Sequence, residues 1–308
     1  MSASTRAPEP QLKLGTDQTH CKFSSEIPPV VTVEPGTVLE VETVDASDGQ
    51  LAAHSNLGDL ASADLSRVHP LTGPIAVSGA RPGDVLTVIL HEVEIGDWGW
   101  VAIPPGMGAL ADQMPPYLRT FSFEPGDTEV RFSQHIRLPI QPFPGILGVA
   151  PDTPEMLSTM PPRKNGGNMD INTLVAGSEI HLPVFVDGAN FSIGDGHAMQ
   201  GDGEVCGTAL EVPLRVVLEL RLTQGGPPLA SPRYETPKVV GVTAFGPNLE
   251  AAAQQATRGM VDVLQREHGL SEQEAYVLCS LAGNLKAAEV VNGAPMMCME
   301  MPRSIFRP

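Results

Sequence analysis

The segment 194–204 reads Gly-Asp-Gly-His-Ala-Met-Gln-Gly-Asp-Gly-Glu and sets three carboxylates and an imidazole among four glycines. Carboxylates and imidazoles are the side chains that hold a divalent metal ion or move protons. Glycines allow the backbone to fold tightly around whatever those side chains bind. A simple turn needs fewer glycines and fewer charged groups. The segment is therefore predicted to form the wall of an active site.

Asp195 and His197 are two residues apart, so in an extended segment both side chains point to one face and can reach one metal ion. A neutral imidazole with carboxylates is a common zinc-ligand set in hydrolases when one coordination position stays open for water. The alternative is a Gly/Asp loop in which a backbone carbonyl satisfies His197. Glu204, a further acidic group in the same segment, favours the metal site.

Glu204 stands between Gly203 and Val205, just before a long apolar stretch. A carboxylate where a loop meets the core is partly desolvated, which raises its pKa and lets it transfer protons near neutral pH. Glu204 is therefore the predicted catalytic acid/base. On residue type alone, a surface carboxylate at the start of a strand is an equally good interpretation.

The segment 165–170 reads Asn-Gly-Gly-Asn-Met-Asp. Backbone N–H groups of its two glycines, with the Asn168 amide, can bind a developing oxyanion, and Asp170 is predicted as a further metal ligand. A plain turn is the alternative. Asp48 ends another predicted strand, where site residues often gather, and is the fourth predicted ligand. His69, in a proline-bounded loop, and Gly167 are the predicted substrate contacts, although a histidine in such a loop is more often structural or solvated.

The chain has four cysteines, at positions 21, 206, 279 and 298, and no Cys-x-x-Cys pair. They are interpreted as free thiols in a reducing cytoplasm rather than as a disulfide framework. Cys206 follows Glu204 by two residues and can face the same pocket. A thiol nucleophile needs a base and an electropositive setting, whereas these surroundings are acidic, so a packed thiol is favoured.

The 308 residues include 19 Lys and Arg against 36 Asp and Glu, a formal net charge of −17. This charge argues against nucleic acid or an anionic membrane as a partner and suits a soluble enzyme that acts on small molecules, although it also fits a merely solubilising surface. No apolar run reaches the ~18 residues of a membrane span, and the N-terminus lacks the apolar region of a secretory signal. A cytoplasmic location is expected.

The chain contains 31 glycines and 30 prolines, yet 42% of its residues are hydrophobic. This combination favours many short strands joined by tight turns. Strands are predicted at 31–33, 38–44, 75–77, 85–93, 128–132, 136–140, 179–186 and 210–222. Helices are predicted at 249–268 and, after a Ser-x-x-Glu capping box at 271–274, to about residue 282. Closing strands follow at 290–291 and 296–301.

Strands followed by helices predict a mainly β fold, with sandwich-like or barrel-like sheets and an α+β C-terminal part that carries two helices. Residues 1–18 are predicted to be a disordered tail, and residues 19–308 a single catalytic domain. Two β lobes, about 19–150 and 165–308, are the alternative. The chain has no Gly-x-Gly-x-x-Gly after a strand and no P-loop, which disfavours nucleotide binding.

Several motifs together carry a family resemblance, which extends from about residue 20 to the C-terminus. The strongest are Pro-Val-Phe-Val-Asp-Gly-Ala at 183–189 and Gly-Asp-x-His-x-x-Gln-Gly-Asp-Gly-Glu at 194–204. The others are Asp-Gly-Gln at 48–50, Leu-Thr-Gly-Pro at 71–74, Arg-Pro-Gly-Asp at 81–84, Pro-Gly-Ile-Leu-Gly at 144–148, Pro-Pro-Arg at 161–163 and Gly-Gly-Asn-Met-Asp at 166–170. Taken together they resemble the acetamidase/formamidase family.

The resemblance implies hydrolysis of short aliphatic amides to ammonia and a carboxylate, a mainly β fold, and assembly into homodimers or larger oligomers. Two departures from the family pattern bear on substrate choice. Lys164 stands where an acidic residue is expected before the Gly-Gly pair, and Phe23 stands where a tryptophan often follows the first histidine.

The function predicted from the sequence is metal-dependent hydrolysis of formamide-like or acetamide-like amides. Asp195, His197, Asp170 and Asp48 are expected to hold a divalent ion, with zinc favoured and calcium or magnesium as alternatives. The ion would lower the pKa of bound water towards ~7. Glu204 would accept the proton of that water and pass it to the leaving nitrogen. The alternatives are a cysteine-dependent amidase that uses Cys206, and a non-catalytic protein of the same fold that binds a metal or small ligand.

Overall fold

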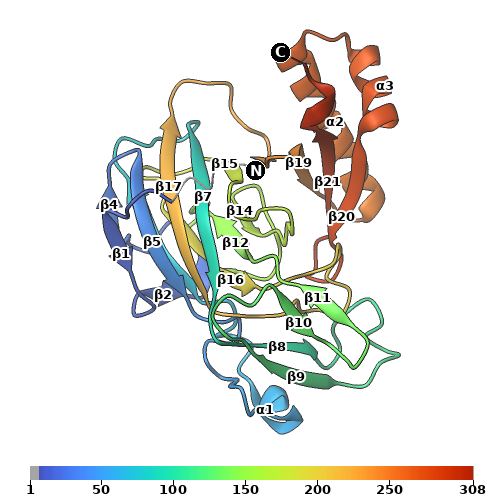
Figure 1. The fold of residues 1–308 in the computed structure, drawn as a ribbon. Coiled ribbons are helices and arrows are strands. Elements are labelled where there is room, and N and C mark those ends of the chain that lie inside the picture. The colour runs from blue at the N-terminus through green and yellow to red at the C-terminus, as the bar shows by residue number, and fades with distance from the viewer. Residues whose placement is uncertain (1–6, 308) are drawn as a thin grey trace.

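A computed structural model describes residues 7–307, and most of its regular structure is β-strand (Figure 1). One large sheet has the strand order β1-β5-β17-β7-β15-β18-β19-β21-β20. Its strands are β1 (Leu12–Leu14), β5 (Thr37–Thr43), β17 (Leu214–Thr223), β7 (Val85–Ile95), β15 (Glu179–Pro183), β18 (Arg233–Glu235), β19 (Val239–Phe245), β21 (Met296–Pro302) and β20 (Asn284–Glu289).

The second large sheet has the order β14-β12-β16-β6-β2, with β4 paired to β6. Its strands are β14 (Gly166–Asn168), β12 (Phe143–Gly148), β16 (Phe191–His197), β6 (Leu71–Val77), β2 (Thr19–His20) and β4 (Val31–Val33). Three smaller pairings are β8 (Trp98–Ile103) with β9 (Tyr117–Ser122), β10 (Glu129–Arg131) with β11 (Arg137–Pro139), and β3 (Lys22–Phe23) with β13 (Leu157–Ser158).

The main hydrophobic core lies between the two large sheets. Val41 of β5 and Leu218 of β17 share it with Leu147 of β12 and Ile193 of β16, and all four are fully buried. Alternation along each strand sends one set of side chains into this core. The predicted mainly β fold is therefore confirmed.

Both large sheets combine strands from the two halves of the chain. In the first sheet β7 pairs with β17, and in the second β12 pairs with β16. A boundary between lobes at 19–150 and 165–308 would therefore run between hydrogen-bonded strands in both sheets.

The N-terminal segment differs from the prediction for residues 1–18. Residues 1–6 lie outside the described residues, but Leu12–Leu14 forms β1, which pairs in parallel with β5. Alternation explains the strand, because Leu14 faces the core and is 8% exposed while Lys13 points away from it. Three residues of alternating character were too short a signal to predict it.

The C-terminal helices cover the end of the first sheet that holds β19, β20 and β21 (Figure 1). Helix α2 (Leu249–His268) spans the predicted residues and ends at Gly269 in the left-handed conformation. Helix α3 (Glu272–Ala282) starts at the predicted capping box. The predicted strand at 290–291 is wrong, because β20 runs from Asn284 to Glu289 and begins directly after α3.

Two short helical elements complete the described fold: α1 (Leu57–Ser62) and the 3-10 helix η1 (Arg303–Ile305). None of the helices within residues 7–307 combines the length and apolar character that crossing a membrane requires.

Replacing Glu40 by glutamine is expected to lower the free energy of unfolding by about 1 kcal/mol at neutral pH. Its carboxylate accepts hydrogen bonds from Lys13 of β1 at 2.8 Å and from Arg215 of β17 at 2.6 Å. These bonds, that of Lys13 foremost, hold the pKa of Glu40 below its usual value. The stabilisation is therefore present above the unfolded-state pKa and is lost as pH falls through the lowered folded-state pKa.

Urea denaturation of wild type and Glu40→Gln at neutral and acidic pH measures this difference. Glu94→Gln is the matched control, because Glu94 also pairs with Arg215 at 2.8 Å but its side chain is 54% exposed. Exposed pairs contribute little, so the control should stay close to wild type. A difference between Glu40→Gln and wild type that persists at acidic pH would contradict the argument.

Candidate active site

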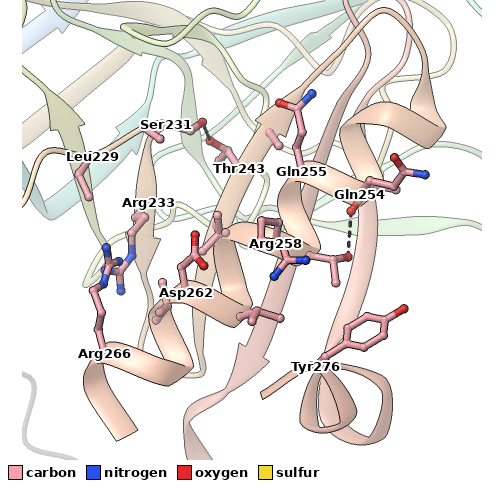
Figure 2. Close-up of a pocket in the computed structure, with 18 of the residues that line it drawn as sticks. Leu229, Ser231, Arg233, Thr243, Gln254, Gln255, Arg258, Asp262, Arg266 and Tyr276 are labelled. Atoms are coloured by element: carbon pink, nitrogen blue, oxygen red, sulfur yellow. Dashed lines mark hydrogen bonds between the residues drawn. The ribbon is translucent and has the colours of Figure 1, made fainter. Parts of the chain in front are cut away.

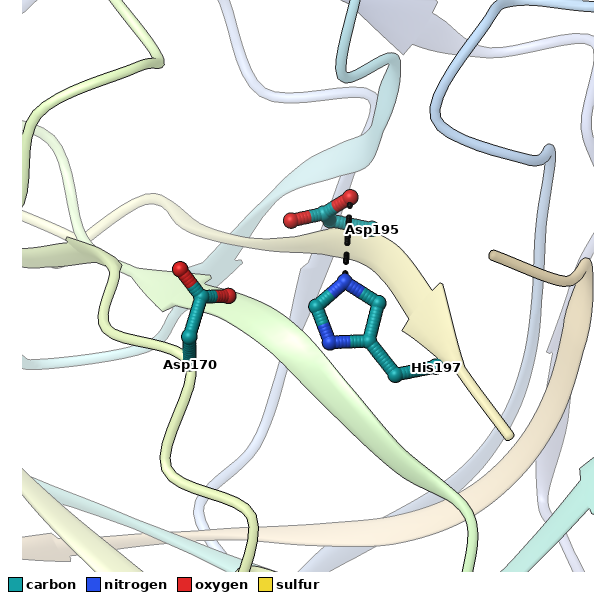
Figure 3. Close-up of side chains that lie close together, drawn as sticks. All are labelled: Asp170, Asp195 and His197. Carbon is teal, nitrogen blue, oxygen red and sulfur yellow. Dashed lines mark ion pairs between the residues drawn. The ribbon is translucent and has the colours of Figure 1, made fainter. Parts of the chain in front are cut away.

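The pair Asp195 and His197 lies at the end of β16, and the two side chains share one face of the strand as predicted (Figure 3). Asp195 Oδ1 is 3.6 Å from His197 Nε2. Both residues are buried, with exposures of 3% and 0%. The two side chains thus lie together as the sequence predicted, and their role as metal ligands stays a prediction.

Gly194 and Gly196 alternate with Asp195 and His197, and their missing side chains leave room on the opposite face of the strand. A Cβ on Gly196 would lie 2.4 Å from the Val212 carbonyl oxygen and from Leu214 Cγ, and one on Gly194 would lie 2.5 Å from the Pro70 carbonyl oxygen. Neighbouring backbone can approach β16 only because these side chains are missing.

Asp170 follows β14, which is separated from β16 by β12, and its side chain reaches the same place (Figure 3). Its backbone N–H donates to the carbonyl of Gly145, as does that of Met169, at 3.2 and 3.1 Å. These bonds tie the segment to β12. Ligand atoms of Asp170, Asp195 and His197 all lie within 4.8 Å of one another, so the three side chains can bind one ion.

Gly145 of β12 keeps the space between these three side chains open. An ideal Cβ there would lie 2.6 Å from Asp170 Oδ1, 2.8 Å from Asp195 Oδ2 and 2.8 Å from His197 Cε1. All three approaches are closer than a real Cβ tolerates. The three side chains therefore surround a position that only glycine leaves free.

Several buried polar atoms around this position make no hydrogen bond among the described residues, although His197 Nε2 and Glu211 Oε2 lie 3.3 Å apart as an ion pair. They are both ring nitrogens of His197, Oδ1 of Asp170 and Oε2 of Glu211. Buried polar atoms are normally satisfied, and each exception needs a reason. Imidazole nitrogen with carboxylate oxygens is a donor set that zinc accepts, so these residues fit a divalent ion.

Opposing pKa shifts show how unbalanced the buried charge is. Burial alone would raise the pKa of Asp195, but His69 and His197 outweigh it and hold this pKa at about 2. Burial lowers the pKa of His197, yet Glu211 and Asp195 raise it well above its ordinary value. Burial and the charge of Glu204 raise the pKa of Asp170 well above its ordinary value. A bound cation would favour the charged carboxylates here.

Glu204 lies beside this cluster, 7% exposed, with a backbone φ of 47°. Ligand atoms of Glu204, His197 and Glu211 all lie within 4.8 Å of one another, and so do those of Asp170, Glu204 and Glu289. Each such set is called a ligand-distance group below. Burial, with the charges of Glu211 and Glu289 adding to it and that of His197 opposing it, raises the pKa of Glu204 well above its ordinary value. The partly desolvated carboxylate predicted from the sequence is therefore present beside the predicted ligands.

Three residues of the cluster were missed by the sequence analysis: Glu211, Glu289 and Asn292. Glu211 Oε2 is 3.3 Å from His197 Nε2. The Asn292 amide nitrogen lies 3.2 Å from Asp170 Oδ2, 3.4 Å from Glu204 Oε2 and 2.8 Å from Glu289 Oε2. The available signal was a lone carboxylate within an apolar run, as in Ala-Leu-Glu-Val at 209–212 and Ala-Ala-Glu-Val at 287–290.

The oxyanion donors predicted at 166–168 are engaged elsewhere. The Gly166 N–H donates to the Arg163 carbonyl at 3.0 Å, and the Asn168 amide donates to the Met160 carbonyl at 3.0 Å. Gly167 lies in β14 against Leu147 of β12. The prediction is corrected because a local turn and the pairing of β14 use groups that looked free in the sequence.

Asp48 is not part of the cluster. Its carboxylate forms an ion pair with Arg67 at 2.6 Å, and it belongs to none of the ligand-distance groups among the described residues. His69 is near, with Nε2 4.0 Å from Asp195 Oδ1 and a buried Nδ1 that has no partner among the described residues. The structure thus brings His69 to the site and separates Asp48 from it.

Phe23 and Lys164, which the sequence analysis also singled out, do not belong to the cluster. Phe23 is buried in a small cluster with Leu71 and Ile146. Lys164 lines a cleft of about 1230 Å³ between α2 and the strands β18 and β19, with Arg233, Arg258 and Tyr276 (Figure 2). This larger cleft contains none of the predicted catalytic or ligand residues.

A second cleft, of about 500 Å³, does reach the cluster. Glu204 lines it, and so does Phe143, whose ring meets His197 edge-on at 5.0 Å. Cys206 also lines it, and its thiol donates to the Thr208 carbonyl at 3.2 Å.

Replacing Cys206 by alanine is expected to lower turnover less than about tenfold, whereas removing a catalytic nucleophile costs on the order of 10⁶. The reason is that the Cys206 thiol donates to the Thr208 carbonyl and belongs to no ligand-distance group with a histidine among the described residues. Initial rates of wild type and Cys206→Ala decide between the two outcomes. Abolished turnover would establish the cysteine-dependent alternative.

Comparisons with known proteins agree with the sequence resemblance. The Acetamidase/Formamidase family model matches residues 8–158 and 153–308. An acetamidase from Mycolicibacterium smegmatis is 30% identical over 271 residues, 67% of this chain and 66% of the relative. A formamidase from Methylophilus methylotrophus is 30% identical over 265 residues, 68% of this chain and 65% of the relative. The matches thus span just under two thirds of the length of these relatives.

A solved structure is similar over nearly its whole length. It is described as a recombinant predicted acetamidase/formamidase from the thermophile Thermoanaerobacter tengcongensis. It shares 34% identity with this chain at a TM-score of 0.89, and the match covers 96% of each chain.

Proposed function

Because the chain belongs to the acetamidase/formamidase family, we propose that it is a metal-assisted hydrolase of small non-peptide amides. The products are ammonia and a carboxylate. Relatives named acetamidase and formamidase support the reaction class. The observation that carries the proposal is the buried set of unpartnered His197 and Asp170 atoms around the space that Gly145 leaves open.

Asp170, Asp195 and His197 would hold the ion. When bound, a divalent ion supplies Lewis-acid chemistry, which polarises a carbonyl and makes water more acidic. The imidazole favours zinc, because calcium and magnesium prefer oxygen ligands alone. Glu211 lies against His197 at 3.3 Å and would orient the ring.

Glu204 would accept a proton from the attacking water and deliver it to the leaving nitrogen. The desolvation that raises its pKa suits both transfers near neutral pH. Proton delivery matters because an amide nitrogen leaves poorly unless it is protonated. His69, beside Asp195 with an unpartnered Nδ1, is the proposed substrate contact and takes the place of the engaged groups at 166–168.

Assembly into a homodimer or larger oligomer remains a prediction. Helix α3 presents exposed apolar side chains that would support it: Tyr276, Val277 and Leu281 are 63%, 54% and 79% exposed.

The proposed function is tested by ammonia release from a panel of primary amides, with elemental analysis of the purified protein. Chelator-treated protein should lose activity and regain it with added zinc. His197→Ala should neither retain zinc nor turn over any amide. A protein that releases no ammonia but binds amides would be the non-catalytic binder, and full activity after complete metal removal would exclude the metal.

A further inference from the structure

The 500 Å³ cleft beside Glu204 is larger and more apolar than acetamide requires. Hydrophobic side chains make up much of its lining, among them Val101, Phe121, Phe132, Leu138, Met199 and Leu210. Clefts of roughly 300–1,000 Å³ accommodate drug-sized ligands. Acetamide, about the size of a few water molecules at ~30 Å³ each, would leave most of it unfilled.

Two hairpins build the outer wall of this cleft. Val101 and Phe121 come from β8 and β9, and Leu138 comes from β11, which pairs with β10 (Figure 1). The hairpins stand beside the second large sheet, which carries the ligand cluster. The wall is therefore separate from the elements that hold the predicted metal ligands.

Arg119 holds the aromatic part of the wall in place. Its guanidinium lies 4.5 Å from the ring centre of Phe121 and 5.0 Å from that of Phe132. It also donates to the Phe132 carbonyl at 2.6 Å. Cation–π contact together with a hydrogen bond fixes both rings before any ligand arrives, which reduces the entropy cost of binding an apolar group.

The inner end of the cleft is polar and suited to a primary amide. Gln200 lines it beside Glu204, and its side-chain nitrogen donates to the Asp170 carbonyl at 3.2 Å. The side-chain oxygen of Gln200, Oε1, is buried and accepts no hydrogen bond among the described residues. An N–H of a substrate amide would satisfy it.

We propose that the substrate is a primary amide with an apolar acyl group larger than acetyl, either aromatic or a medium-length alkyl chain. The acyl group occupies the cleft between the two hairpins, and the amide N–H donates to Gln200 Oε1. This inference rests on the proposed amide hydrolysis and names its substrate class. The reaction is unchanged: water adds to the carbonyl carbon, the C–N bond breaks, and a carboxylate and ammonia leave.

The test compares kcat/KM for formamide, acetamide, hexanamide and phenylacetamide with zinc-loaded protein. Each buried methylene is worth about fourfold, so hexanamide, with four more methylenes than acetamide, should exceed it on the order of 100-fold. Val101→Phe, which fills the cleft, should reduce the ratio of hexanamide to acetamide about tenfold or more. Ile103→Phe is the matched control, because Ile103 is on the same strand and half-buried but does not line the cleft.

A second variant keeps the test decisive if Val101→Phe fails to fold. Phe132 is 40% exposed at the rim, so Phe132→Ala should fold and should lower kcat/KM for phenylacetamide more than it lowers kcat/KM for acetamide. Acetamide or formamide as the best substrate, with both variants unchanged in their ratios, would overturn the inference and leave the proposed function intact. No hydrolysis of any amide would instead refute the proposed function.

Discussion

Gly145→Ala is expected to lower kcat/KM for every amide substrate by about 100-fold or more, because a shift of about 1 Å at a reacting centre costs this much. The added methyl group would lie within 2.8 Å of atoms from Asp170, Asp195 and His197 at once. Its strand β12 is paired on both sides, with β14 and with β16, and the Gly145 carbonyl accepts from the Met169 and Asp170 N–H groups. The backbone cannot retreat, so the three side chains must separate.

Zinc content, measured with activity, shows whether this loss comes from the ligand set. We expect Gly145→Ala to bind zinc more weakly than wild type while its far-ultraviolet circular dichroism is unchanged. Gly226→Ala is the matched control, because its nearest contact would be Thr223 Cγ2 at 3.8 Å, an ordinary van der Waals distance. Wild-type zinc affinity and activity in Gly145→Ala would remove the basis of the proposed metal site.

Glu204→Gln is expected to lower kcat by about 10²–10⁴-fold, the usual contribution of a general acid or base. The amide keeps the shape of the carboxylate and can still accept the hydrogen bond from Asn292, but it cannot take a proton from water. KM should change little, because only the proton transfer is removed.

The same substitution should leave the metal-free protein as stable as wild type or more stable at neutral pH. Burial raises the folded-state pKa of Glu204, so ionisation of this carboxyl destabilises the folded state at pH values above its unfolded-state pKa. A group that costs stability and supplies activity is expected at a functional site. Glu219→Gln, a carboxylate on β17 paired with Arg221 at 2.6 Å, serves as the control. Unimpaired kcat in Glu204→Gln would falsify the acid/base assignment.

The helices and the central Asp-His pair were predictable because their signals are local. The capping box at Ser271 is a pair of bonds within four residues, with Glu274 donating its N–H to the Ser271 hydroxyl and accepting from the Ser271 N–H at 2.9 Å. Likewise, Asp195 and His197 share a face because strand side chains alternate with period two.

The remaining members of the cluster depend on contacts between distant segments. Glu211 meets His197 through an isolated β-bridge, and Asn292 reaches Asp170 across 122 positions of the chain. Asp48 had the right residue type at a strand end, but Arg67 is its partner. Residue type and spacing do not tell which strand will pair with which, so they cannot predict these partners.

Short-range hydrogen bonding and side-chain alternation thus sufficed to specify a mainly β chain, its C-terminal helices and an adjacent Asp-His pair in segment 194–204. The register of β12 against β16, which places Gly145 between Pro144 opposite Gly196 and Ile146 opposite Gly194, is a property of the folded sheets. That register opens the space among Asp170, Asp195 and His197, and it decides which buried carboxylates surround that space. The physical reason is that sheet pairing joins residues far apart in the chain, whose proximity no local pattern encodes.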